Sequence, residues 1–312
     1  MSAGGEPSAP LYKLRALYQN YVPAGSKRVR PRGHSLFLRP NTLVEAVEAL
    51  AASGGQILAG GTDVFPSLGD RPLSGPVLDI SSLRELKGVT HDPQYIHLGA
   101  LTSWTELIRT PLPRCFDGLK AAARQIGGIQ IQNRGTIAGN LCNASPAADS
   151  VPPLLALDAE VELVSRVGLR RMPLAEFIVG NRKTLLRPGE ILSHVLVPRS
   201  LENAASTFLK LGARRYLVIS IAMVAVLIEK DSADRVRQAR VSVGSCSVVA
   251  RRLLELEREL IGAPAAGLGS RATPAHLQQL SPVSDVRASA LYRTEAALQL
   301  VRRALDDCAG AA

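Results

Sequence analysis

The residues of this chain best suited to binding chemistry are glycines and small polar residues gathered in two segments. One runs from Leu58 to Asp63, and the other runs from Ile126 to Asp149. Glycine adopts positive φ and leaves space beside the main chain, so consecutive N–H groups can converge on an anion. Because each segment follows an apolar run, we interpret them as loops that hold opposite sides of one pyrophosphate. This pairing favours a dinucleotide cofactor.

Motifs of other nucleotide sites and of self-contained catalysis are not apparent in the sequence. We find no Gly-x-Gly-x-x-Gly before a helix, no P-loop, no Gly-x-Ser-x-Gly elbow and no His-Glu-x-x-His. The five histidines show no ligand spacing, and the four cysteines form no Cys-x-x-Cys pair. This argues against a zinc or iron–sulfur site in the chain. Any difficult chemistry is therefore expected from a bound cofactor.

The size and charge of the chain limit its class. A length of 312 residues predicts two or three subdomains. The net charge of +10 raises a nucleic-acid hypothesis, but the densest basic run, Lys27–Arg32, has no interleaved aromatic residues for base stacking. A surface for an acidic partner, or simple solubility, explains the charge equally well.

The longest apolar run, Leu217–Ile228, is shorter than the roughly 20 residues of a membrane span. With no visible signal peptide, we expect a cytoplasmic protein without a membrane span.

Alternating strands and helices are predicted to position the two segments. Leu43, Val47 and Leu50 fall at helical spacing before Gly54-Gly55, and the strand 56–59 then leads into the first loop. A helix is predicted over 104–108 after a Ser103 cap. Further strands are predicted over 77–80, 95–100, 161–165, 170–173 and 191–197.

The C-terminal third has a different pattern. Three antiparallel strands are predicted over 208–211, 217–228 and 235–249, in a sheet buried on one face. Apolar residues at helical spacing follow over 253–260 and 291–305. The whole chain is therefore expected to have an α+β fold, with helices that close a C-terminal sheet domain.

An ordered series of motifs makes the chain resemble a known family. The series covers roughly residues 36–306 and consists of Ala59-Gly60-Gly61-Thr62-Asp63, Thr136-Ile137-Ala138-Gly139-Asn140, Ala144–Asp149, Arg182–Leu186, Pro188–Leu192, Phe208-Leu209-Lys210 and Asp285–Arg293. These segments resemble the FAD-binding medium subunit of the molybdenum hydroxylases, the family of xanthine dehydrogenase and carbon monoxide dehydrogenase.

The resemblance implies a specific architecture. It predicts a two-subdomain FAD-binding module of the vanillyl-alcohol oxidase type, followed by a C-terminal antiparallel sheet with helices. The expected parts are a flexible basic leader over residues 1–35, an N-terminal FAD-binding α/β subdomain over 36–95, a second FAD-binding subdomain over 96–205 and a sheet-plus-helices domain over 206–312.

The resemblance also assigns cofactor contacts. The glycine-bearing segments would hold the pyrophosphate, Ile126 and Leu192 would contact the flavin rings, Asp149 would bond cofactor hydroxyls, and Lys210 would place a positive charge near the pyrimidine edge. The full set of predicted cofactor-binding residues is Ile57, Leu58, Ala59, Gly60, Gly61, Thr62, Asp63, Val64, Ile126, Thr136, Ile137, Ala138, Gly139, Asn140, Asp149, Leu192 and Lys210. No catalytic side chain and no metal ligand is predicted.

The function that the resemblance implies is electron transfer within a heteromeric complex. Molybdenum cofactor is expected on a large partner subunit and [2Fe-2S] centres on a small one, with FAD on this chain passing electrons to NAD⁺, oxygen or a quinone. Segment 212–220 lacks the acidic residue that many relatives have after the arginine pair, so the sequence leaves the acceptor open. A stand-alone flavin oxidoreductase and a basic nucleic-acid-binding or scaffold protein are the alternatives.

Overall fold

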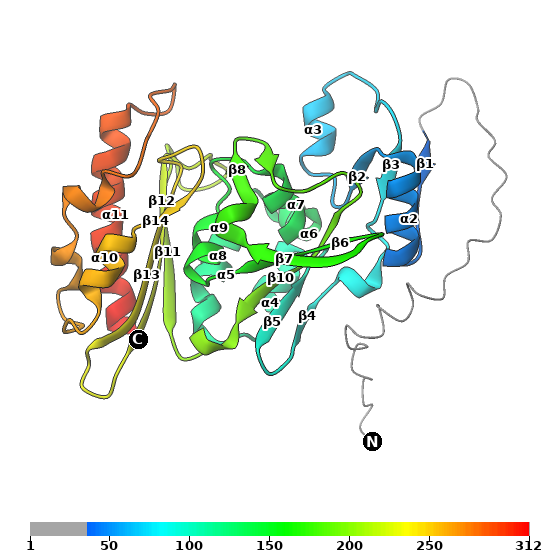
Figure 1. The fold of residues 1–312 in the computed structure, drawn as a ribbon. Helices are drawn as coiled ribbons and strands as arrows, with labels where there is room; N and C mark the ends of the chain where they lie inside the picture. Colours follow the sequence, from blue (N-terminus) through cyan, green and yellow to red (C-terminus); the bar gives the residue numbers. More distant parts are fainter. Residues whose placement is uncertain (1–35, 312) are drawn as a thin grey trace.

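The computed structural model describes residues 36–311, so the predicted leader and its basic run lie outside the described residues. Three sheets follow one another across the molecule, with helices between and beside them (Figure 1). Within residues 36–311, none of the helices has the length and apolar character needed to cross a membrane. The boundaries predicted at residues 35, 95 and 205 stay predictions.

The first sheet is small and parallel. Its strands, in the order β1-β3-β2, are β1 (Phe37–Leu38), β3 (Val77–Asp79) and β2 (Gln56–Leu58). Helix α2 (Leu43–Ser53) begins at Thr42, whose hydroxyl accepts a hydrogen bond from the Glu45 N–H, and buries the predicted apolar face. The sequence predicted α2 and β2 correctly, and β2 leads into the first glycine turn and helix α3 (Val64–Leu68).

The second sheet is antiparallel and contains the strands predicted in the middle of the chain. Its order is β4 (Val89–His91), β5 (Tyr95–Gly99), β10 (Ile191–Pro198), β6 (Glu160–Ser165) and β7 (Gly168–Pro173). The helices beside it are α4 (Trp104–Arg109), α5 (Asp117–Ala123), α6 (Ile129–Arg134), α7 (Ile137–Asn143), α8 (Val151–Ala156) and α9 (Leu174–Phe177). A hairpin of β8 (Ile178–Gly180) and β9 (Lys183–Thr184) follows α9. Ser103 caps α4 as predicted, in a capping box with Glu106.

The third sheet is antiparallel and carries the C-terminal helices. Its strands are β11 (Ala205–Leu211), β12 (Ala222–Lys230), β13 (Val236–Gly244) and β14 (Arg251–Arg252), and the helices are α10 (Leu254–Leu260) and α11 (Ala290–Ala311). Single 3₁₀ turns occur at Arg84–Leu86, Arg114–Phe116, Arg199–Leu201, Leu268–Arg271 and Pro274–Leu277.

The three predicted antiparallel strands are present, but the predicted bounds of two are wrong. The expected strand 217–228 begins only at Ala222, because Leu217 adopts positive φ and residues 217–221 form a loop in which Leu217 and Ile219 are exposed. The expected strand 235–249 ends at Gly244, where Ser245 turns the chain with positive φ. Apolar composition alone therefore overestimated both strands.

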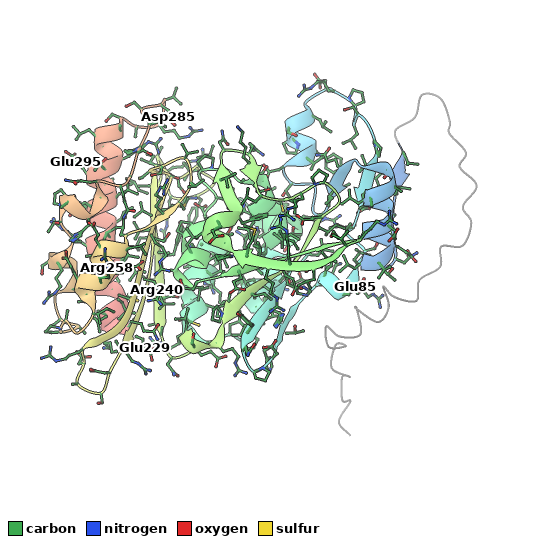
Figure 2. All side chains as sticks on the ribbon, viewed as in Figure 1. Glu85, Glu229, Arg240, Arg258, Asp285 and Glu295 are labelled. Atoms are coloured by element: carbon green, nitrogen blue, oxygen red, sulfur yellow. The ribbon has the colours of Figure 1, made fainter. Side chains whose placement is uncertain are left out.

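The third sheet is also buried on both faces rather than on one. Alternate residues of β12 belong to different cores: Val224 and Val226 pack with α10 and α11, whereas Met223 and Ala225 join the core of the preceding sheets. Arg240 on β13, labelled in Figure 2, donates to Asp158 across this junction, with 2.9 Å between Nε and Oδ2. This sheet therefore forms a wall shared by two cores.

Candidate functional site

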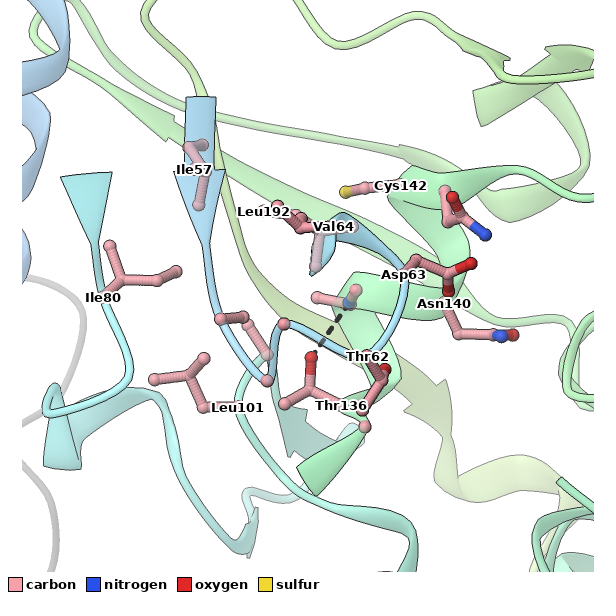
Figure 3. A pocket seen from close by; sticks show the side chains of 18 of the residues that line it. Ile57, Thr62, Asp63, Val64, Ile80, Leu101, Thr136, Asn140, Cys142 and Leu192 are labelled. Atoms are coloured by element: carbon pink, nitrogen blue, oxygen red, sulfur yellow. Dashed lines mark hydrogen bonds between the residues drawn. The ribbon is translucent and has the colours of Figure 1, made fainter. Parts of the chain in front are cut away.

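A cavity of about 600 Å³ lies between the first sheet and helices α6 and α7 (Figure 3). Its size is typical of small-molecule and cofactor sites, which range from about 300 to 1,000 Å³. Both glycine-bearing segments line it. The predicted residues in its lining are Ile57, Ala59, Gly60, Gly61, Thr62, Asp63, Val64, Ile126, Thr136, Ala138, Gly139, Asn140 and Leu192.

The first glycine-bearing segment is a tight turn after β2, and we call residues 60–63 the first wall. Leu58 ends the strand, with its carbonyl accepting a hydrogen bond from the Ile80 N–H. The Gly61 carbonyl then accepts from Phe65 at the start of α3. Within residues 36–311, the backbone N–H groups of the first wall bond no protein acceptor. They are consecutive donors beside a cavity, which is the arrangement that an anionic group needs.

Glycine is required in the first wall for two separate reasons. Gly61 has a φ of 74°, which an L side chain rarely adopts. A Cβ at Gly60 would lie 1.8 Å from the Arg134 carbonyl oxygen, so the backbones of the two segments approach too closely for any side chain. The turn of the first wall therefore packs directly against the backbone at Arg134, at the end of the opposite segment's first helix.

The second segment is helical and not the loop that we predicted, and we call residues 136–140 the second wall. Thr136 caps α7, because its Oγ1 accepts the Gly139 N–H at 3.1 Å. The Ile137 and Ala138 N–H groups donate to the carbonyls of Thr102 and Ala100. The amides of residues 137–140 are thus already bonded, and the polar groups that this helical part of the wall offers are side chains.

Asn140 is the polar side chain that the second wall offers. Its Oδ1 accepts a hydrogen bond from Ser150 at 2.6 Å, which fixes the rotamer and leaves the amide NH₂ without an acceptor among the described residues. Figure 3 shows Asn140, Thr62, Asp63 and Thr136 gathered in one part of the cavity view. This polar part can accept an anionic, hydroxylated ligand.

Apolar residues line the remainder of the cavity. Ile57, Ile126 and Leu192 were predicted contacts and supply surface for a flat apolar group. Residues of the lining that the sequence analysis missed are Gly55, Gln56, Ile80, Ala100, Leu101, Trp104, Ile131, Gly135, Cys142, Asn143, Leu186 and Ile191. Gln56, Gly135 and Ile191 are adjacent in sequence to predicted contacts, and this adjacency was the signal available for them.

Four predicted contacts do not line the cavity. Leu58 and Ile137 are buried behind its walls. Asp149 and Lys210 pair with each other, with 2.6 Å between Oδ2 and Nζ, and Ser220 donates to Asp149 at 2.5 Å. The Asp149 and Lys210 side chains are only 7% and 5% exposed. The pair therefore fastens β11 to the segment between α7 and α8.

The environment of Asp149 sets its charge. Burial raises the pKa of its carboxyl group, while the charge and hydrogen bond of Lys210 and the hydroxyl of Ser220 favour the ionised form. The carboxylate is therefore dependent on Lys210 as its counter-ion.

Cysteine and metal chemistry are not features of this cavity in the described chain. Burial raises the pKa of the Cys142 thiol to about 12, so this lining residue is a neutral thiol at physiological pH. Within residues 36–311, no group of three or more His, Cys, Asp or Glu side chains is placed to hold a metal ion.

Comparisons with known proteins assign both halves of the chain to family models. Residues 30–200 match the FAD binding domain in molybdopterin dehydrogenase, and residues 207–308 match the CO dehydrogenase flavoprotein C-terminal domain.

Several curated proteins are similar over most of their length. The nicotinate dehydrogenase FAD-subunit of Eubacterium barkeri is 34% identical, covering 83% of this chain and 90% of its own. The xanthine dehydrogenase FAD-binding subunit of Escherichia coli O157:H7 is 31% identical over 88% and 96%. The carbon monoxide dehydrogenase medium chain of Hydrogenophaga pseudoflava is 30% identical over 86% and 94%.

Solved structures show the same fold. A chain of the carbon monoxide dehydrogenase of Hydrogenophaga pseudoflava matches with a TM-score of 0.79 at 28% identity, covering 91% of this chain and 99% of that one. A chain of the Cu,Mo-CO dehydrogenase matches with a TM-score of 0.80 at 24% identity, over 91% and 100%. The predicted α+β class, a flavin-binding module followed by an antiparallel sheet with helices, is confirmed.

Proposed function

This chain belongs to the FAD-binding subunits of the molybdenum hydroxylases, and from that premise we propose that it relays electrons through FAD held in the cavity. The electrons would come from [2Fe-2S] centres on a partner subunit and leave to NAD⁺, oxygen or a quinone. When bound, the flavin supplies the exchange of single electrons for electron pairs. The protein supplies binding, orientation and electrostatics.

The observation that carries this proposal is the row of unbonded N–H groups in the first wall. Buried backbone donors are normally paired. Among the described residues, the N–H groups of Gly60–Asp63 have no protein acceptor and these residues line the cavity, so the pyrophosphate of FAD would accept from them. The amide of Asn140 would donate from the opposite wall, while Ile126 and Leu192 would contact the rings. The residues thus fit the group.

The sequence-based roles of Asp149 and Lys210 as flavin contacts stay predictions. Their mutual ion pair gives them a second role. It holds Asp149 in place, and with it the next residue, Ser150, whose hydroxyl orients the Asn140 side chain. Both roles are open to the same experiments.

The partners belong to the same proposal. The relatives named as an FAD-subunit and as medium chains are each one part of a larger enzyme. We therefore propose a large subunit with the molybdenum cofactor, a small iron–sulfur subunit and a cytoplasmic complex. The organic substrate would be chosen on the large subunit.

The cavity assignment is tested by a matched pair of glycine variants. Gly61 and Gly75 have φ of 74° and 77°, so leucine strains both backbones alike, and at Gly61 the Cβ would in addition lie 2.6 Å from the Phe65 ring. Only position 61 lies in the cavity lining. The complex purified with Gly61→Leu is expected to lose most of its FAD absorbance, whereas Gly75→Leu keeps it. Equal flavin content in both variants would refute the assignment.

Electron relay is tested with the purified complex and with the chain alone. Substrate should reduce the flavin of the complex, and the isolated flavin-loaded chain should show no reduction by the same substrate. Turnover of an organic substrate by the isolated chain would instead favour a stand-alone flavin oxidoreductase.

A further inference from the structure

Strand β10 contributes to the cavity wall and contains a β-bulge next to the residues that line the cavity. Ile191 and Leu192 line the cavity, and the pairing of β10 with β6 shifts register between Leu192 and His194. Ser193 is the extra residue of this β-bulge and is 1% exposed. Bulges re-aim the side chains on either side of them, so this one decides the direction of Leu192.

A single buried carboxylate gathers the polar groups of the bulge. Glu162 on β6 is 2% exposed, and its Oε1 accepts a hydrogen bond from Ser193 Oγ at 2.9 Å. Its Oε2 accepts a hydrogen bond from Arg171 Nε on β7 at 3.1 Å, and Nη2 of the same ion pair lies at 3.0 Å. His194 Nδ1 lies 3.3 Å from Oε1, without the alignment of a hydrogen bond. Strands β6, β7 and β10 therefore meet at this one side chain.

The charge of Glu162 is held in place by these neighbours. Burial opposes ionisation, but the contacts of His194 and Ser193 and the charge of Arg171 hold the pKa of Glu162 below its usual range. An ionised carboxylate accepts stronger hydrogen bonds than a neutral group does. The bulge is therefore fastened by charge-assisted bonds.

The bulge is also bonded to the turn that follows β5. The Ser193 carbonyl accepts the Ala100 N–H at 2.8 Å, and both Ala100 and Leu101 line the cavity. A displacement of Ser193 would consequently move lining residues of β10 and of this turn at once.

We propose that Glu162 is a positioning residue for the bound flavin: its carboxylate holds Ser193, and Ser193 holds Leu192 and Ala100 in the cavity wall. Glu162 lies outside the cavity lining, so it acts only through these neighbours. The inference rests on the proposed placement of FAD in the cavity.

Glu160 provides a matched control. It lies two residues away on β6, so its side chain is on the same face. Within residues 36–311, its side chain accepts only the Tyr95 hydroxyl, at 3.4 Å. Its position opposite Leu196 is away from the bulge.

The test measures FAD affinity and the visible circular dichroism of bound flavin in the full-length chain. Glu162→Ala is expected to raise the dissociation constant about tenfold, since it removes the carboxylate that accepts from Arg171 and Ser193 and leaves Ser193 Oγ only the Glu162 backbone carbonyl, at 3.2 Å. It should also change the dichroism, which reports the asymmetry of the ring environment. Glu162→Gln, which keeps an acceptor for Ser193, should recover part of both. Glu160→Gln should resemble wild type.

A second variant keeps the inference testable if Glu162→Ala does not fold. Ser193→Ala leaves the carboxylate with Arg171 and removes only the link to the bulge. We expect about a threefold rise in the dissociation constant and the same change of dichroism. Wild-type affinity and dichroism in Ser193→Ala and in a folded Glu162→Ala would overturn the role of Glu162.

Failure of this inference differs from failure of the cavity assignment. If Gly61→Leu loses flavin while the Glu162 and Ser193 variants bind as wild type does, only the positioning role is refuted. If Gly61→Leu keeps its flavin, FAD lies elsewhere and both proposals are refuted.

Discussion

The two walls of the cavity both contain glycine, yet they present different groups to a ligand. The first wall, residues 60–63, is an irregular turn whose N–H groups are unbonded within the described chain. The second wall, residues 136–140, is the capped start of α7, and the amides of residues 137–140 are bonded to Thr136, Thr102 and Ala100. One wall therefore offers backbone donors, and the other offers the side chain of Asn140.

The glycines differ in the same way. Gly60 is needed because the opposite backbone lies where its Cβ would be. At Gly139 a Cβ would come within 2.8 Å of Thr136 Oγ1, the atom that caps the helix. Glycine thus permits close approach to Arg134, just before the second wall, at one position and preserves a helix cap at the other. Substitutions should accordingly act on the second wall by changing its side-chain groups and on the first wall by displacing its backbone.

The largest effect is expected behind the second wall, at Lys210. Lys210→Met leaves Asp149 buried without its counter-ion and should lower the free energy of unfolding by about 3 kcal/mol. Burial raises the pKa of Asp149, so the folded variant takes up a proton more readily than the unfolded chain does. The stability deficit should therefore shrink as the pH falls from 7 to 5, as followed by denaturant titration at each pH.

Lys230→Met is the control for this change. Lys230 also pairs with an aspartate, Asp234, at 2.7 Å, but the Asp234 side chain is 66% exposed. Its loss should cost below about 1 kcal/mol with no comparable pH dependence. A similar loss in both variants would show that burial of the Lys210 pair is unimportant. A spectral change of flavin in Lys210→Met without loss of stability would instead support the direct flavin contact.

The next effect tests the close approach of the walls. Gly60→Ala forces a Cβ against the Arg134 carbonyl at the end of α6 and must displace the first wall from this segment. We expect a cost of about 2 kcal/mol in FAD binding, roughly a thirtyfold higher dissociation constant, measured by flavin fluorescence. Gly180→Ala places its Cβ 3.7 Å from the nearest atoms, an ordinary contact, and should bind FAD as wild type does.

The sequence predicted the first wall better than the second for a physical reason. A short apolar strand followed by Gly60-Gly61 is a local signal, because strand, stop and turn are all set by adjacent residues. The second wall depends on distant contacts: Ala138 donates to Ala100, and Ser150 orients Asn140. Its glycines suggested a loop, but these contacts and the Thr136 cap stabilise a helix.

The same limit explains Lys210 and residues 217–221. Lys210 was recognised from a motif, but its partner Asp149 lies 61 residues away, so no local sequence pattern predicts that the two residues form a pair. Leu217 belongs to an apolar run that resembles a strand, yet Arg214 donates to the Leu217 carbonyl and the residue adopts positive φ. Tertiary contacts override composition at both places.

A smaller effect is expected when a negative charge replaces the amide of Asn140 in the second wall. Asn140→Asp keeps the shape and the acceptor for Ser150 but replaces the free NH₂ by a negative charge beside the proposed pyrophosphate. We expect about a tenfold weaker FAD affinity at low salt, and a smaller loss at high salt because ions screen the repulsion.

Asn143→Asp is the matched control for Asn140. Asn143 also lies on α7 and in the cavity lining, but Arg182 donates to its side chain. The adjacent guanidinium should neutralise an introduced carboxylate, so FAD affinity should stay close to that of wild type. Equal losses in the two variants would mean that the charge acts over the whole cavity and that Asn140 has no specific contact.

The smallest effect concerns the cap that makes the second wall helical. Thr136→Val is nearly isosteric but removes the oxygen that accepts the Gly139 N–H, which should lower the free energy of unfolding by about 1 kcal/mol. Thr136→Ser keeps the hydroxyl and should be close to neutral in a thermal or denaturant measurement. Because the cap also sets the start of the helix that carries Asn140, flavin affinity should fall in the valine variant and stay unchanged in the serine variant. If valine lowers stability but leaves FAD binding intact, then the backbone donors of Gly60–Asp63 suffice, and the two walls are unequal in energy as well as in chemistry.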